Sequence, residues 1–142
     1  MENLSVFYDK VTTDLKQLND MYERTMSDIK EYQELTSTLK IMLDFEKSHS
    51  KDDIKMRTNL GEYVFADVTL REKNKVVVKM IGDIYAELTY ERGLAFAEGK
   101  IVLLEKYIED YKLSMGKLKA HMDVGLIIKN EMMVQEGIIE TV

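Results

Sequence analysis

The fold is set by residues 54–88, which read IKMRTNLGEYVFADVTLREKNKVVVKMIGDIYAEL. Apolar and polar residues alternate from Ile54 to Leu60, which predicts a half-buried strand ending at Gly61. Residues 62–70 carry apolar side chains on both faces of a second strand, which should therefore be covered on both sides. Residues 71–75 form a connection, 76–81 a third strand, 82–83 a tight turn and 84–88 a fourth strand. The stretch predicts two β-hairpins.

Two long amphipathic segments flank the hairpins. Apolar residues recur every seven positions before them, with a second set four residues after the first, which predicts a helix over 4–47. After the hairpins, apolar residues step by three and four along a heptad seam that Lys129 breaks, and we predict a helix over 90–134. The first seam comprises Leu4, Val11, Leu15, Leu18, Tyr22, Thr25, Ile29, Tyr32, Leu39 and Leu43. The second comprises Leu94, Ala97, Ile101, Leu104, Ile108, Tyr111, Met115, Leu118, Met122 and Gly125.

Local signals support these boundaries. The 142-residue chain contains no proline, which permits long uninterrupted elements. Thr89 supplies an N-cap oxygen to the second helix, and Gly93 and Gly99 indicate close packing. Helices of matched length favour antiparallel pairing, with Leu4 near Met132. We predict one domain over 1–142 of the α+β class, mostly α: a long antiparallel coiled-coil hairpin with two β-hairpins between its helices.

Composition excludes several functions. The chain has no cysteine, so disulfides, thiolate zinc sites and cysteine nucleophiles are absent. Its net charge of -6 and the lack of a basic stripe argue against nucleic acid, and no apolar run is long enough for a membrane span. His49 and His121 are too far apart in a hairpin to share a metal, and no catalytic motif is present. We expect a cytoplasmic protein that is not an enzyme and holds no cofactor.

The strands predict assembly. Four short strands in this stretch cannot close a barrel, and free edges rich in Val and Ile would aggregate. Another such chain is the simplest partner for these edges, so the sequence predicts an obligate oligomer. The expected assembly residues are Ile54, Met56, Leu60, Tyr63, Phe65, Val76, Val78, Ile84 and Tyr85.

The two ends of the chain predict a second contact surface. Flexible methionine and aliphatic side chains suit the capture of apolar segments of many different proteins. The alternative is that these residues only close the end of the coil. The expected contact residues are Leu4, Phe7, Met132, Met133, Val134, Ile138 and Ile139.

The order helix, two hairpins, helix resembles the α class of prefoldin subunits. Residues 56–61 (MRTNLG) resemble the end of that family's first strand, and Glu87-Leu88-Thr89 followed by Leu94, Ala95, Phe96 and Lys100 resembles its entry into the second helix. The resemblance spans nearly the whole chain. It implies a hetero-hexamer with β-class subunits and a second α-type subunit, in which coiled-coil tips hold non-native client proteins without ATP.

Within the α class, the junction and the later Lys119-Ala120-His121 are most similar to a member of prefoldin-like complexes. That resemblance implies the URI scaffold protein and R2TP-type co-chaperones as partners, and the nucleus as a second location. The alternative function is a coiled-coil adaptor or transcriptional co-regulator that does not hold clients. An enzyme is a third, weaker hypothesis.

Overall fold

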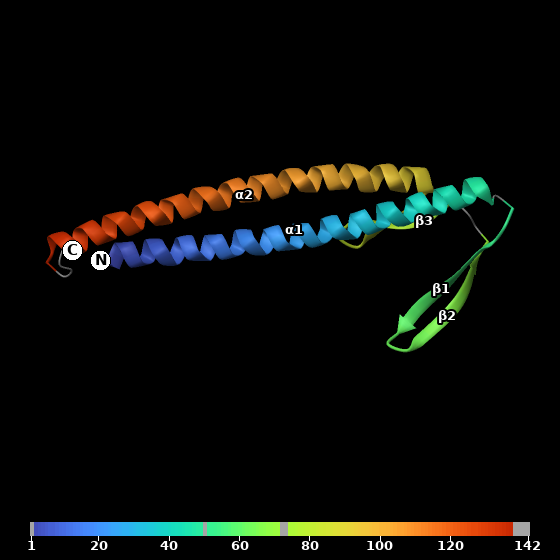
Figure 1. Cartoon of the computed structure of the whole chain (residues 1–142), viewed down its shortest axis with the longest axis horizontal. Coiled ribbons are helices and arrows are strands. Elements are labelled where there is room, and N and C mark those ends of the chain that lie inside the picture. The colour runs from blue at the N-terminus through green and yellow to red at the C-terminus, as the bar shows by residue number, and fades with distance from the viewer. Residues whose placement is uncertain (1, 50, 72–73, 138–142) are drawn as a thin grey trace. The chain divides into compact units, whose positions relative to one another are not determined.

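The computed structural model describes residues 2–49, 51–71 and 74–137. Helix α1 spans Glu2–Ser48 and helix α2 spans Tyr90–Gln135. Between them in the sequence lie strands β1 (Ile54–Gly61), β2 (Val64–Leu70), β3 (Val76–Ile81) and β4 (Ile84–Leu88). Figure 1 labels both helices and the first three strands. This is the predicted fold of two long helices with two hairpins between them. None of the described helices has the length and apolar character needed to cross a membrane.

The helix ends follow from local chemistry. Helix α1 ends at Ser48, where a run of polar residues begins in the sequence, and the ring of His49 stacks on Phe45 with centroids 4.9 Å apart. At the start of α2 the hydroxyl of Thr89 accepts the Arg92 N–H at 3.3 Å, which confirms the expected N-cap. Asn74 adds a second cap, because its side-chain oxygen accepts the N–H of Tyr90 at 3.2 Å. The connection between the hairpins is thereby tied to the first turn of α2.

The chain divides into two compact units, Met1–Lys30 with Val102–Val142 and Glu31–Ile101. In the first unit the start of α1 lies beside the end of α2 (Figure 1). A Cβ added at Gly125 would lie 3.1 Å from the Phe7 ring and 3.2 Å from the Tyr8 hydroxyl, so glycine here permits close helix contact. Tyr8 thus faces α2, a seam position that the sequence analysis missed.

In the second unit the β3–β4 hairpin packs against the helices. Leu39, Val78, Tyr90 and Ala97 are all buried. A Cβ at Gly93 would lie 3.0 Å from Val76 Cγ1 and 3.3 Å from Leu39 Cδ1, which confirms the predicted close packing at this glycine.

Several sequence expectations about the helices need correction. Gly99 does not mark close packing, since no described atom lies within 4 Å of a Cβ added there. Lys129, which interrupts the apolar seam, lies at a half-buried position, where its aliphatic stem can cover apolar surface while the ammonium stays in water. Thr36 is a further buried seam residue that the heptad count left out, and its hydroxyl donates to the Tyr32 carbonyl at 2.7 Å.

The strands form two separate two-stranded antiparallel sheets, β1–β2 and β3–β4. The bounds of β3 and β4 are those predicted, and Gly82 opens their turn with a φ of 57°. The second strand, however, begins at Val64 rather than residue 62. Tyr63 therefore lies in the turn between β1 and β2. The register shift between Asn59 and Gly61, where the Asn59 side chain accepts the Gly61 N–H at 3.0 Å, ends the regular ladder before this turn.

Candidate assembly and contact surfaces

The two faces of the β1–β2 hairpin differ. Ile54, Met56 and Thr58 pair with Leu70, Val68 and Ala66 and form the mainly apolar face. Lys55 and Arg57 alternate with them and form a polar face opposite Thr69 and Asp67. Arg57 and Asp67 stand directly opposite each other and form an ion pair at 3.0 Å. The expectation of an apolar surface on both sides of the whole second strand is therefore wrong for most of its length.

Exposed apolar side chains gather instead around the turn of this hairpin. Tyr63 is 89% exposed, and both residues that follow it are 59% exposed. The members of this cluster, called the hairpin tip below, are Leu60, Tyr63, Val64 and Phe65. Aromatic and aliphatic side chains concentrated in this way are typical of a protein–protein contact.

The β3–β4 hairpin has one covered and one open face. Val76 and Val78 point toward Gly93 and Leu39. Alternate residues must therefore point the other way. That open face carries Val77 and, opposite Lys79, Tyr85. Ile81 and Ile84 pair with each other beside the turn, and these two residues are exposed as well, like Val77 and Tyr85.

The predicted assembly residues thus fall into two groups. Those available to a partner are Met56, Leu60, Tyr63, Phe65, Ile84 and Tyr85. Ile54 and Val78 are instead buried, and Val76 packs against the helices within the chain. Three further exposed apolar residues of the hairpins were not predicted from the sequence: Val64, Val77 and Ile81. Side chains along a strand alternate between its two faces. In the run Val76-Val77-Val78 the middle side chain must therefore lie on the face opposite the other two, and this alternation could have identified Val77 as exposed.

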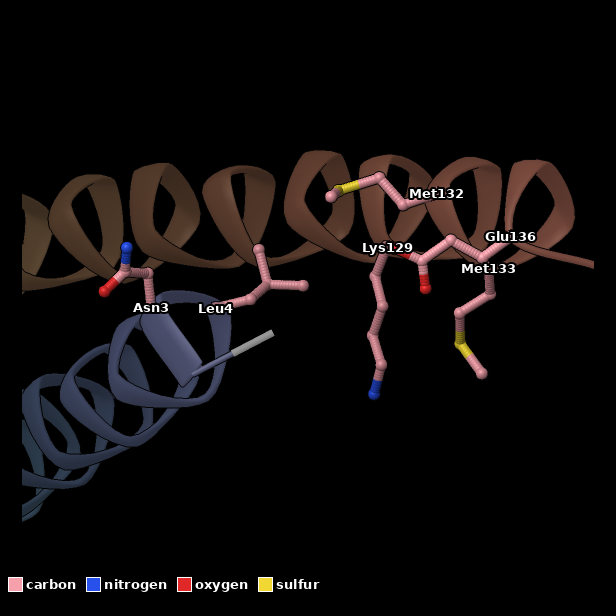
Figure 2. A pocket seen from close by; sticks show the side chains of 6 residues that line it. All are labelled: Asn3, Leu4, Lys129, Met132, Met133 and Glu136. Carbon is pink, nitrogen blue, oxygen red and sulfur yellow. The ribbon is translucent and has the colours of Figure 1, made fainter. Parts of the chain in front are cut away.

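A hollow of about 240 Å³ lies where the first turn of α1 meets the last turns of α2. Figure 2 shows Leu4 extending from α1 toward α2, with Lys129 and Met133 extending from α2 on the side of α1. Asn3, Met132 and Glu136 complete the lining. The structure therefore brings Leu4 and Met132 into one site, as the antiparallel pairing predicts.

The other predicted contact residues lie in different settings. Phe7 packs on Tyr8 in an edge-on arrangement, with ring centroids 5.7 Å apart, yet remains 37% exposed. Met132 and Val134 are 46% and 38% exposed, so their apolar atoms are available to a ligand. Ile138 and Ile139 lie outside the described residues. The hollow can accommodate apolar groups beside the ammonium of Lys129 and the carboxylate of Glu136.

The ion pairs between described residues lie on the solvent-exposed surface. Lys40 and Glu98 form an ion pair between the helices at 3.6 Å, with both side chains more than half exposed. The Nζ of Lys112 donates to Glu109 at 2.9 Å, and this hydrogen bond and the charge of Glu109 raise the pKa of Lys112. No group of three or more His, Cys, Asp or Glu side chains that could hold a metal occurs in the described ranges.

The family model for Prefoldin subunit matches residues 9–128, and the chain belongs to the prefoldin family. Among its relatives are two proteins named Protein UXT homolog. The one from Dictyostelium discoideum is 20% identical over 82% of this chain and 70% of its own length. The one from Nematostella vectensis is 23% identical over 82% of this chain and 72% of its own length. They confirm the resemblance to UXT-type members.

A solved structure has the same fold. The filamentous PFD from Methanocaldococcus jannaschii, determined by cryo-electron microscopy, superposes with a TM-score of 0.67 at 20% identity. The match covers 88% of this chain and 98% of that one. The architecture of two helices around two hairpins is therefore the prefoldin architecture.

Proposed function

We propose that this chain is an ATP-independent chaperone or co-chaperone subunit of a prefoldin or prefoldin-like hetero-oligomer. Its hairpins join other prefoldin subunits, and the paired helix ends contact non-native client proteins. One observation carries the assembly step: the hairpin tip and the open face of β3–β4 expose large apolar side chains that a single chain does not cover. Burying such surface between subunits is favourable by about 25 cal/mol per Å².

Membership of the family supports β-class subunits and a second α-type subunit as the partners. The similarity to proteins named UXT homolog supports a prefoldin-like complex, for which we propose the URI scaffold protein and R2TP-type co-chaperones. We propose the cytoplasm as the main location and the nucleus as a second one. The proposal assigns no catalytic step and no cofactor to the chain.

Co-expression with β-class subunits tests the assembly step. Phe65→Ser and Tyr85→Ser remove exposed apolar side chains from the two hairpins, and we expect both to lose co-purification with the partners. Leu113→Ser is the matched control, because Leu113 is 61% exposed on α2 and belongs to the compact unit that does not contain the strands. A wild-type chain that purifies as a stable monomer with fully protected strand amides would contradict assembly.

Client contact is tested on the assembled complex. We expect deletion of residues 132–142 to reduce the suppression of aggregation of an unfolded model protein without ATP, while assembly persists. Met132→Lys should act in the same direction, because a charge replaces an exposed apolar side chain at the hollow. Leu113→Lys is the control. If both tip variants hold clients as well as the wild type, the tips are not the contact site, and the adaptor hypothesis gains support.

A further inference from the structure

The first unit has two flanks that differ in chemistry. On one flank a hollow of about 540 Å³ runs between the helices, with Leu18 of α1 and Leu118 of α2 among its lining residues. Its other lining residues are Asp14, Gln17 and Met21 from α1 and Ser114 and Lys117 from α2. We call this side the open flank.

Heptad spacing extends the open flank beyond the hollow. Phe7 lies seven residues before Asp14, and Tyr107 and Ile128 lie seven before and fourteen after Ser114, so all three share this side. Phe7, Met21, Tyr107 and Ile128 are between 37% and 46% exposed. The open flank is thus a row of half-covered apolar side chains, interrupted by Asp14 on α1 and by Ser114 and the exposed His121 on α2.

The opposite flank is more polar. Its heptad positions carry Thr12 and Asn19 on α1 and Glu105, Lys112 and Lys119 on α2, all of them exposed, and the next position on α2 is an exposed apolar residue, Leu126. Since polar side chains cost free energy when they are buried unpaired, this flank suits solvent. The open flank suits another helical surface, because paired helices gain stability by covering apolar rows of this spacing.

The charges on the open flank indicate what that surface is. Asp14 on α1 and Lys117 on α2 line the same hollow and therefore lie at the same level of the coiled coil. A second level of opposite charges lies one helical turn further along. Arg24 follows Met21 by one turn on α1, and Asp110 precedes Ser114 by one turn on α2. At this level the positive charge is on α1 and the negative charge on α2, the reverse of the first level. A surface that matches this flank must therefore place positive charges opposite Asp14 and Asp110 and negative charges opposite Lys117 and Arg24.

We propose that the open flank is an interface between two copies of this chain, related by a two-fold axis parallel to their coiled coils. This symmetry places α1 of each copy against α2 of the other at the same level. Asp14 then faces Lys117 of the second copy, and Arg24 faces its Asp110, and the symmetry repeats each pair. Met21 faces the small side chain of Ser114. A two-fold axis perpendicular to the helices and centred on the hollow would instead bring Asp14 of both copies together.

Charge reversal in the full-length chain tests this interface by sedimentation velocity over a range of concentrations. Asp14→Lys and Lys117→Asp each put like charges at both symmetric contacts, and each should weaken self-association about tenfold. Asp9→Lys and Lys119→Asp make the same charge changes on exposed positions outside the open flank and should associate as the wild type does. The strands are unchanged in every variant, so any association through them contributes equally.

Mixing the two single variants separates contacts between chains from effects within one chain. In the mixed dimer the introduced lysine of one chain faces the introduced aspartate of the other, and the remaining contact is native. Association should therefore return to the wild-type level, although each chain still carries its own like-charged pair. Mixtures as weak as the single variants overturn the proposal, as does a wild-type chain that stays monomeric. If the substitutions weaken only the binding of other prefoldin subunits, a partner helix occupies the flank and the proposal fails.

Discussion

Replacing Gly93 by alanine should show how tightly β3 packs on α2. Alanine in place of glycine inside a helix normally adds about 1 kcal/mol of stability. At Gly93 the added Cβ would lie 3.0 Å from Val76 Cγ1 and 3.3 Å from Leu39 Cδ1, and overpacking of this kind costs about 1–3 kcal/mol. Gly99 lies in the same helix with no described atom within 4 Å of an added Cβ. We therefore expect Gly99→Ala to be more stable than Gly93→Ala by about 1–3 kcal/mol.

Thermal unfolding followed by far-UV circular dichroism measures this difference, which corresponds to about 2–8 °C per kcal/mol for chains near this size. Val76→Ala removes the methyl group that crowds the new Cβ. In that background Gly93→Ala should cost less than it does alone, with an interaction free energy of about 1 kcal/mol. Equal melting temperatures for Gly93→Ala and Gly99→Ala would refute the close contact, and strict additivity with Val76→Ala would refute its assignment to β3.

Three further substitutions test the local structure by urea unfolding. Gly82→Ala should lose about 1–2 kcal/mol because its φ is 57°, whereas Gly61→Ala, at an open position without a positive φ, should lose less. Thr89→Ala should lose about 1 kcal/mol with the N-cap, whereas Thr13→Ala, whose hydroxyl bonds only to the preceding turn, should change stability by less than about 0.5 kcal/mol. Asn74 combines a φ of 70° with the cap on α2, so Asn74→Gly should be less destabilising than Asn74→Ala. Equal losses within any pair would contradict the corresponding reasoning.

Much of the fold could be predicted because its signals are local. The seven-residue spacing of apolar residues identified both helices, and Thr89 marked the start of α2 to the residue. The bounds of β3 and β4 followed from Gly82-Asp83, a turn sequence between two apolar runs. Tyr63 was predicted to lie in the second strand because the alternation of polar and apolar residues continues through Glu62 and Tyr63. The chain turns at these two residues instead. The turn lacks the Asn-Gly or Asp-Gly signature that would have marked it.

The surfaces were harder to predict, because exposure depends on contacts between segments distant in sequence. Val76, Val77 and Val78 have identical side chains, and only the close approach of Gly93 decides that the first and third face the helices. Seam spacing alone likewise could not distinguish the two flanks of the coiled coil. The distinction requires knowing that Asp14 and Lys117 line one hollow.

The two hairpins differ in what they need from a partner. A two-stranded hairpin is at best marginally stable in water unless a further strand or a helix covers one face. The β3–β4 hairpin has that support, because Val76 and Val78 pack toward Gly93 and Leu39. In the β1–β2 hairpin only Ile54 is buried, and the apolar tip around Tyr63 is open. Assembly through both hairpins would therefore add most to the stability of β1–β2, since its strands gain in the complex the cover that β3–β4 already has within the chain.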